Sequence, residues 1–403
     1  MTNTPGFTND ELQALCQQHT TPFYVYDADT VRDNIAELQQ AFPDWQLRFS
    51  AKANINRAII KTVHDEGLGF VCGSPKEIER LRRGGVPLED ILYVAVQPSD
   101  DQIQEVISFI NADKLTISIE SLDTLHKLVK HGYNGSGIVR INSNYFTDEE
   151  TFTPRNAKFG LSPQDAIKAF QKMNAEGIEQ AGLYCHTGKM KNERRQRLFY
   201  ESLEGLSDFI AATNTTINQV NVGGGLSVKF TDELEPDLDA MREHVEHIFD
   251  DHDITLTLEP GRYIVANAGV TCTEVTGTKD TPVTKVVSVD LASHHLALNH
   301  VWDEPHEITN ISRDAPATEQ SVSGPSCTAH SGYHCLNQSF TASQTGDFLV
   351  VEKTGAYAHY LGNNFHSQPR PKILIKENDN TYVSRREATL DEIMQCEKHK
   401  RSG

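Results

Sequence analysis

The repeating unit of the fold can be read from residues 182–226, GLYCHTGKMKNERRQRLFYESLEGLSDFIAATNTTINQVNVGGGL. This stretch opens with a short β-type run at 182–186 and closes with another at 220–222. Between them, residues 193–210 place apolar side chains three and four positions apart, which is typical of an amphipathic helix. Strand, helix and strand in this order predict a βαβ unit with parallel strands.

The same alternation extends in both directions along the chain. Amphipathic stretches at 163–173 and 237–249 separate further strand candidates. About eight such repeats close a (β/α)8 barrel of ordinary size. We therefore expect an α/β fold with this barrel over residues 23–269 and strands near 23–26, 46–50, 69–72, 91–96, 115–119, 137–141, 182–186, 220–222 and 254–258.

The chain changes character after Ala268. Residues 306–323 are polar and aperiodic, which favours a long loop. Strand-like runs dominate the rest of this part, and little helix lies between them. The sequence thus predicts a second, mostly antiparallel β domain over residues 270–403, with strands near 270–276, 283–290, 347–352, 372–375 and 381–384.

Composition excludes two classes of partner. The 403 residues contain 56 acidic side chains against 37 Lys and Arg, a formal net charge of −19. Such a chain has no basic surplus with which to neutralise nucleic-acid phosphates or to dock on an anionic membrane. A local cationic pocket for one small anion remains compatible with this charge.

Neither an export signal nor a membrane span is visible. The first ten residues are polar and lack the basic and apolar parts of a signal peptide. The longest apolar runs fall short of the roughly 18–20 residues that a spanning helix needs. Seven cysteines without a C-x-x-C pair are typical of reduced thiols rather than of a disulfide framework or a zinc site. We expect a cytoplasmic protein without a structural metal.

A lysine stands directly after one of the predicted barrel strands. Lys52 follows the run 46–50 in the stretch FSAKAN (49–54). Functional groups of such barrels gather at the carboxyl ends of the strands. Burial lowers the pKa of a lysine and makes its amine a nucleophile for aldehydes. The alternative is a lysine that only extends its ammonium group to the rim.

Two further strand ends carry groups suited to an anion. Val222 precedes three glycines, 223–225, whose backbone N–H groups suit a phosphate, although they can equally form a tight turn. The stretch Glu259-Pro260-Gly261-Arg262 ends another strand. Arg262 can clamp phosphate oxygens and Glu259 can pair with a protonated ring nitrogen, or the two can form a plain salt bridge.

A histidine and a second arginine complete the set. His186 closes one strand, where a lone histidine is often structural, and Arg140 lies inside another, where burial would require an anionic partner. Together with Lys52 and the groups above, they place a lysine, an anion cradle, an arginine, a carboxylate and an imidazole at strand ends. This set suits pyridoxal 5'-phosphate (PLP), with its aldehyde, phosphate, ring nitrogen and flat ring.

The chain resembles the fold type III PLP-dependent decarboxylases, the group of diaminopimelate decarboxylase and eukaryotic ornithine decarboxylase. This resemblance implies a PLP-binding (β/α)8 barrel, a C-terminal β domain that also includes residues 1–22, and a homodimer with a shared active site. The matching motifs span nearly the whole chain in the family's order: YVYD (24–27), SAKAN (50–54), Ser74 with Glu77, RIN (140–142), KFG (158–160), HTG (186–188), GGG (223–225), EPGR (259–262), GPSC (324–327) and GAY (355–357).

The resemblance also implies roles, position by position. Lys52 corresponds to the lysine that forms a Schiff base with the cofactor, and Glu259 to the partner of the ring nitrogen. His186 would stack on the ring, and Arg140 would lie beside the cofactor. Cys327 would arrive from the second subunit as a proton donor to the substrate α-carbon. The phosphate would be held by Gly224, Gly225, Gly261, Arg262 and Tyr357.

The substrate end departs from the family pattern. Leu298 stands where diaminopimelate decarboxylases carry a substrate-binding arginine, and Trp302 where they carry a tyrosine. Thr328 replaces a glutamate that meets the distal amine of the substrate. Three further positions differ from the usual residue: Val71 and Ser331 replace aspartates, and Lys189 replaces a serine.

These departures change the expected substrate. They remove an arginine and several carboxylates and add His and Lys, so selectivity for diaminopimelate, lysine or ornithine loses its physical basis. We expect instead an amino acid or amino-acid conjugate rich in carboxylates, as in siderophore or antibiotic pathways. Substrate contacts are predicted for Cys327, Thr328, Tyr357, His294, His295, Trp302 and Lys189.

Two other functions remain open. One is a meso-diaminopimelate decarboxylase that makes L-lysine in a rearranged pocket. The other is a non-catalytic relative that binds a partner protein, against which the joint presence of Lys52, Glu259, Arg262 and Cys327 argues. A metal site at His294 and His295 is disfavoured, because adjacent residues of a strand point apart.

Overall fold

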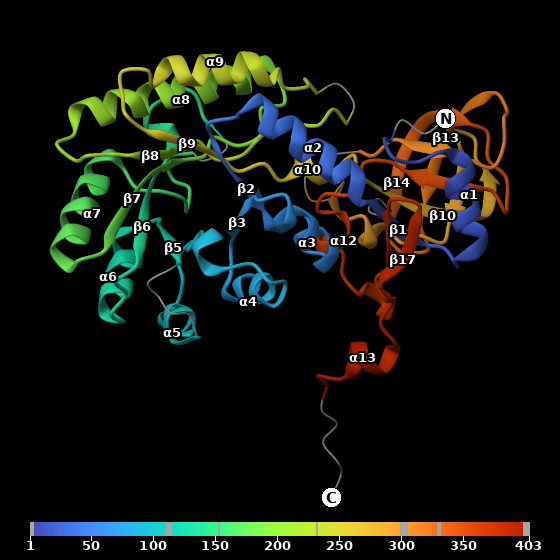
Figure 1. Cartoon of the computed structure of the whole chain (residues 1–403). Coiled ribbons are helices and arrows are strands. Elements are labelled where there is room, and N and C mark those ends of the chain that lie inside the picture. Colours follow the sequence, from blue (N-terminus) through green and yellow to red (C-terminus); the bar gives the residue numbers. More distant parts are fainter. Residues whose placement is uncertain are drawn as a thin grey trace, which may run out of the picture. The chain divides into compact units, whose positions relative to one another are not determined.

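The computed structural model describes residues 4–109, 115–151, 154–230, 233–298, 301, 305–328 and 332–397. Two compact units make up the chain (Figure 1). We call them the barrel unit, residues 34–52 and 60–264, and the β unit, residues 1–33, 53–59 and 265–403.

Eight parallel strands close into a barrel, as the strand–helix alternation predicts. Each strand pairs with the next along the chain, and the last pairs with the first. Eight of the nine expected strand positions are therefore confirmed as barrel strands. They are β2 (Gln46–Ser50), β3 (Gly69–Cys72), β4 (Ile91–Tyr93), β5 (Thr116–Ile119), β6 (Ser136–Ile141), β7 (Glu179–Cys185), β8 (Gln219–Asn221) and β9 (Thr255–Leu258).

Helices α4 to α9 run around the outside of these strands (Figure 1). In α8, the side chain of the N-cap residue Asn192 accepts from the backbone N–H of Arg195, and the buried side chains recur every three or four residues. Among the described residues, no helix has the length and apolar character that crossing a bilayer requires. The helices are α1 (Asn9–Gln18), α2 (Ala28–Ala41), α3 (Arg57–Asp65), α4 (Pro75–Arg83), α5 (Asp100–Phe109), α6 (Leu122–Lys130), α7 (Pro163–Glu176), α8 (Glu193–Ala212), α9 (Leu238–Ile248), α10 (Arg262–Val265), α12 (Ala358–Leu361) and α13 (Leu390–Met394).

The β unit contains a nine-stranded mixed sheet. Its main order is β14-β13-β11-β10-β1-β16-β17, and β15 joins β12 to β10. A core that includes Phe7, Leu12 and Val270 packs on it. The strands are β1 (Phe23–Asp27), β10 (Gly269–Asp280), β11 (Lys285–Val289), β12 (Ile308–Asn310), β13 (Ala317–Ser323), β14 (Tyr333–Thr341), β15 (Phe348–Val351), β16 (Lys372–Glu377) and β17 (Asn380–Arg385).

Two expectations about strands were wrong. The strand expected at 23–26 to open the barrel is β1, which lies between β10 and β16 in the β unit. Its apolar residues fit that core as well as they would fit a barrel, so pattern alone misplaces it. Residues 306–323 are no loop, because they contain β12 and β13. In β13, Gln320 and Ser321 are fully buried polar residues, and this hides the strand from a hydrophobic pattern.

One row of polar side chains crosses the inside of the barrel. Register pairs Arg140 of β6 with Tyr184 of β7, and Tyr184 with Asn221 of β8. Asn221 in turn pairs with Thr257 of β9, two residues before Glu259. Paired residues share a face and alternate residues along a strand share a face. The side chains of Arg140, Tyr184, Asn221 and Glu259 therefore converge inside the barrel near the carboxyl ends of the strands.

Candidate active site

Glu259 is a buried carboxylate just beyond the carboxyl end of β9, with 4% of its surface exposed. The hydroxyl of Tyr184 donates to Oε2 at 2.9 Å, and Nδ2 of Asn221 donates to Oε1 at 2.7 Å. Burial raises the pKa of Glu259, while these two donors and the charges of Arg140 and Lys52 act in the opposite direction. No ion pair of Glu259 is found among the described residues.

Arg140 has the anionic partner that its burial requires. Its Nη1 donates to Oε1 of Glu120 at 3.2 Å, and both side chains are almost completely buried. The guanidinium lies 4.6 Å from the ring centroid of Tyr184 and 4.7 Å from that of Phe159. Burial lowers the pKa of Arg140, but the Glu120 carboxylate outweighs it, so the pKa lies above its ordinary value. Arg140 therefore stays charged.

His186 lies against the glycine loop at 223–225. Its Nδ1 accepts the backbone N–H of Gly224 at 3.2 Å, which leaves Nε2 to carry the proton of a neutral ring. Burial lowers the pKa of His186 well below its ordinary value, and the charges of Arg140 and Lys52 lower it further. The imidazole is therefore neutral at pH 7.

The glycine loop is only partly open to an anion. Gly223 donates its N–H to Oδ1 of Asn221 at 2.8 Å, and Gly224 donates its N–H to His186, so two of the three N–H groups already have acceptors within the protein. Close packing explains the glycines: a Cβ at Gly224 would lie 2.4 Å from the Glu259 carbonyl oxygen, and one at Gly225 2.0 Å from the Gly188 oxygen. Of the three N–H groups, that of Gly225 has no hydrogen bond recorded among the described residues.

Lys52 lies two residues after β2 and is exposed between two buried alanines. Its charge acts on both His186 and Glu259, which places its amine near these two groups. The structure thus brings Lys52, His186, Glu259 and Arg140 to one end of the barrel, the carboxyl-terminal end. An exposed amine on a short, buried turn is accessible to an aldehyde while its backbone is fixed.

Lys189 and Arg262 share one aromatic ring beside this group. The ammonium of Lys189 and the guanidinium of Arg262 each lie 5.3 Å from the ring centroid of Phe230. Lys189 also pairs with Glu233, with 2.6 Å between Nζ and Oε1. Its charge is therefore largely offset before any substrate arrives. Gly261 is buried between β9 and α10, directly before Arg262.

The remaining predicted residues lie in the β unit. Tyr357 has a φ of 64°, an unusual backbone conformation for a non-glycine residue, and its N–H donates to the carbonyl of Ala53 at 2.7 Å. Ala53 follows Lys52 in the chain. Cys327 is exposed, and all seven cysteines are free thiols. Trp302 and Ser331 lie outside the described residues.

The predicted histidines do not supply positive charge. Burial lowers the pKa of His295 to about 3, and burial also lowers the pKa of His294. Nδ1 of His294 lies 3.1 Å from Oγ of Ser326, which ties it to the segment that carries Cys327 and Thr328. Within the described part of the chain, no three His, Cys, Asp or Glu side chains are grouped to hold a metal.

Two departures from the family pattern are buried. Leu298, at the position of the family's arginine, is completely buried. Val71 packs with Leu92, Ile138 and Tyr184 inside the barrel. The change from aspartate to Val71 therefore gives Tyr184, the donor to Glu259, an apolar neighbour in place of a charged one.

Sequence reasoning missed three residues of the site. Glu120 directly follows β5, so the rule that found Lys52 also applies to it. Tyr184 lies two positions before His186 and shares its face, and Asn221 begins the glycine motif. Each was detectable as a polar residue at a strand end, but their contacts depend on strand neighbours distant in sequence.

These residues fit PLP in shape and chemistry. A carboxylate held by two neutral donors suits a protonated ring nitrogen, and the neutral ring of His186 suits a flat face. The N–H of Gly225 and the guanidinium of Arg262, which lies against the ring of Phe230, are the groups suited to a phosphate. Lys52 supplies an exposed primary amine at the same end.

Residues 28–266 match the family model described as pyridoxal-dependent decarboxylase, pyridoxal binding domain. The chain belongs to this family. It is a PLP-dependent carboxy-lyase of the amino-acid decarboxylase type, as the motifs indicate.

Curated relatives of this decarboxylase cover nearly its whole length. Diaminopimelate decarboxylase of Aquifex aeolicus is 24% identical and covers 95% of this chain and 93% of its own. The enzyme of the same name from Neisseria meningitidis serogroup A is 27% identical, over 94% of this chain and 95% of its own.

Solved structures share its fold. Diaminopimelate decarboxylase of Helicobacter pylori, complexed with L-lysine, has a TM-score of 0.87 at 23% identity, over 95% of this chain and 98% of its own. Lysine/ornithine decarboxylase of Vibrio vulnificus, complexed with putrescine, has a TM-score of 0.80 at 19% identity, over 92% of this chain and 98% of its own. The barrel with its C-terminal β unit is therefore the fold of this group.

Proposed function

We propose that this decarboxylase removes the α-carboxylate of an amino acid at the carboxyl-terminal end of its barrel. One observation carries the proposal, namely the surroundings of Glu259. It is buried, accepts from two neutral donors, and lies within electrostatic reach of Lys52 and Arg140. Because no ion pair consumes its charge, this carboxylate can support a protonated ring nitrogen.

Each group at this end would have a separate task. When bound, PLP supplies a sink for the electron pair that departing CO2 leaves on the α-carbon. Lys52 would bind the cofactor aldehyde, and Glu259 would keep the proton on the ring nitrogen. His186 would lie against the ring as a neutral imidazole, which adds no charge to the developing anion.

Phosphate binding would fall to the loop side of the site. Gly225 and Arg262 are the strongest candidates, with Gly261 beside them and Tyr357 from the β unit. Gly224 would act by letting the loop pack against the carbonyl of Glu259, since its own N–H is already bound to His186. Arg140 would not bind the phosphate; it would position Tyr184, against whose ring it lies, and stay paired with Glu120.

The proton that replaces CO2 needs a donor on the substrate side. We propose Cys327 for this task, supplied by the second subunit of a homodimer. Its exposure in the single chain is compatible with a position that a partner completes. Thr328, next to Cys327, would contact the distal part of the substrate.

Relatives favour meso-diaminopimelate as the substrate over a carboxylate-rich conjugate. Two observations on this chain also favour diaminopimelate over an acidic substrate. Lys189 is paired with Glu233, and His295 is neutral, so neither adds a free positive charge for an acidic substrate. We therefore propose L-lysine as the product.

A second candidate, the carboxylate-rich conjugate of siderophore or antibiotic pathways, rests on Leu298 and Thr328. These positions lack the arginine and glutamate that the family pattern directs at the two ends of diaminopimelate. A substrate without a distal ammonium does not need the glutamate that Thr328 replaces.

A decarboxylation panel distinguishes these proposals. The PLP-loaded protein is mixed with meso-diaminopimelate, L-lysine, L-ornithine and N-citryl-diaminopropionate, and released CO2 and amine products are identified by mass spectrometry. We expect CO2 and L-lysine from meso-diaminopimelate, and neither product from Lys52→Ala. CO2 from the citryl conjugate alone would establish the second candidate. Failure to bind PLP, with no CO2 from any substrate, would instead favour a non-catalytic partner-binding protein.

A further inference from the structure

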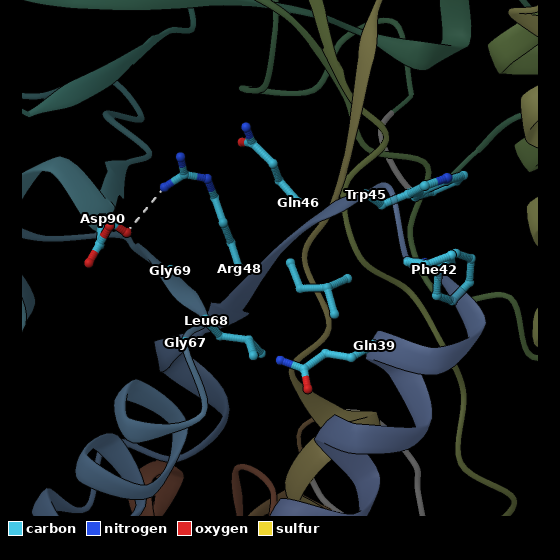
Figure 2. A pocket seen from close by; sticks show the side chains of 11 residues that line it. Gln39, Phe42, Trp45, Gln46, Arg48, Gly67, Leu68, Gly69 and Asp90 are labelled. Atoms are coloured by element: carbon cyan, nitrogen blue, oxygen red, sulfur yellow. Dashed lines mark hydrogen bonds between the residues drawn. The ribbon is translucent and has the colours of Figure 1, made fainter.

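A cavity of about 420 Å3 opens at the amino-terminal ends of β2 and β3, within the barrel unit (Figure 2). Trp45 precedes β2, Gly69 begins β3, and Asp90 precedes β4. The groups assigned to catalysis lie at the carboxyl-terminal ends of the strands. Nothing in the proposed reaction uses this cavity, although its volume is in the range of small-molecule sites.

Arg48 gives the cavity a fixed positive charge. Its Nη1 donates to the backbone carbonyl of Asp90 at 3.1 Å, and Figure 2 shows the side chain extended toward Asp90. It passes Gly69, where a Cβ would lie 2.9 Å from that carbonyl oxygen and 3.2 Å from Nη1. Among the described residues the guanidinium makes no other hydrogen bond, so it keeps donors with which a ligand could pair.

Apolar side chains form the smaller part of the remaining wall, and polar groups form the larger part. Phe42 and Trp45 have ring centroids 4.8 Å apart, and Leu47 and Leu68 also line the cavity. The indole N–H of Trp45 donates to Glu246 at 3.1 Å, which fixes the orientation of the ring. The apolar part of this wall can contact the carbon skeleton of a small ligand whose anionic group binds Arg48.

The charge balance selects the kind of anion. Burial lowers the pKa of Arg48, and the charges of Glu259 and Asp90 raise it. With the Asp90 carboxylate nearby, a second negative charge on the ligand would be repelled, whereas a single carboxylate matches the planar guanidinium. A dianion such as phosphate is therefore disfavoured.

We propose that this cavity binds a small organic monocarboxylate, with the carboxylate on Arg48 and the carbon skeleton of the ligand against Trp45 and Leu47. The site is separate from the substrate site at the other end of the barrel. Its existence does not depend on the proposed function.

Occupancy has a consequence for catalysis, and this consequence does rest on the proposed function. β2 and β9 pair Gln46 with Thr257 and Leu47 with Leu258, so Arg48 and Glu259 come next in the same register. A carboxylate on Arg48 offsets a positive charge close to Glu259. Without this positive charge the ionised form of Glu259 is less stable. We therefore expect the ligand to lower kcat and leave KM unchanged.

Trp45 provides a direct test, because the chain has only two tryptophans. In a Trp302→Phe background of the PLP-loaded protein, Trp45 fluorescence is titrated with phenylacetate, phenylacetamide and inorganic phosphate. We expect a saturable change with phenylacetate, and at least tenfold weaker binding of the amide and of phosphate. Arg48→Met should weaken phenylacetate binding at least tenfold, whereas Arg83→Met, which removes an exposed arginine on α4, should not.

A second variant guards against loss of folding in Arg48→Met. Gln39→Glu changes an exposed residue of the cavity wall on α2, and the added charge should weaken phenylacetate binding about threefold to tenfold. Equal affinity for acid and amide, or unchanged affinity in both variants, would overturn the proposal. Binding in this background, without any CO2 release by the wild-type protein, would leave this site standing and reject the proposed function. CO2 release by the wild-type protein without binding would reject this site and leave the proposed function standing.

Discussion

Glu120 and Glu259 are both buried carboxylates at the carboxyl end of the barrel, yet their surroundings differ. Glu120 has its own cation, since Arg140 donates to both of its oxygens, and it also accepts from Ser118 and from the N–H of Gly160. Among the described residues, the side chain of Glu259 accepts hydrogen bonds only from the neutral groups of Tyr184 and Asn221. A buried carboxylate that forms an ion pair with its own cation has a structural role. A buried carboxylate that is held only by neutral donors can pair with a cationic ligand.

Breaking the structural pair should have the largest effect. Glu120→Gln leaves Arg140 buried without its counter-ion, so we expect the free energy of unfolding to fall by about 3–5 kcal/mol. Denaturant unfolding measures this loss. The control is Glu79→Gln, whose partner Arg83 is exposed and whose change should cost under about 1 kcal/mol. Equal losses in the two variants would contradict the structural role of Glu120.

Glu259→Gln should separate function from stability. Removing this fixed charge should lower kcat by about 10²–10³-fold, the cost of losing one preorganised electrostatic group. Stability should change much less than in Glu120→Gln, because an amide can still bond to Tyr184 and Asn221 and strands no buried charge. Steady-state CO2 release with the substrate found in the panel measures kcat. An unchanged kcat would remove Glu259 from the reaction.

The smallest effect concerns pH. Burial raises the pKa of Glu259 in the folded apoenzyme, so between the ordinary and the raised pKa the folded chain binds more protons than the unfolded chain. Stability of the wild-type apoenzyme should therefore fall relative to Glu259→Gln as pH rises through this window. Unfolding of both proteins from pH 4.5 upward measures the difference. A difference that grows in favour of the wild type would contradict the raised pKa.

Much of the barrel could be predicted from sequence, because apolar strands and amphipathic helices alternate with distinct periods. β1 could not be placed, because an apolar strand looks the same in either unit until its neighbours are known. Lys52, His186, Glu259 and Arg262 were detectable, since strand ends mark positions where functional groups gather.

The partners of these residues were harder to foresee. Tyr184 meets Glu259 across 75 residues of chain, and Lys189 meets Glu233 across 44. Such pairs arise from strand order and loop path, which no local pattern contains. For that reason the sequence indicated a positive charge at Lys189 but gave no sign that Glu233 offsets it.

Identifying the residue that carries the cofactor tests the central claim most directly. The PLP-loaded protein is reduced with borohydride, digested, and its peptides are analysed by mass spectrometry. We predict that the reduced pyridoxyl group is attached to Lys52, and that Lys52→Ala yields no labelled peptide. Attachment to Lys189 or to another lysine would contradict the account.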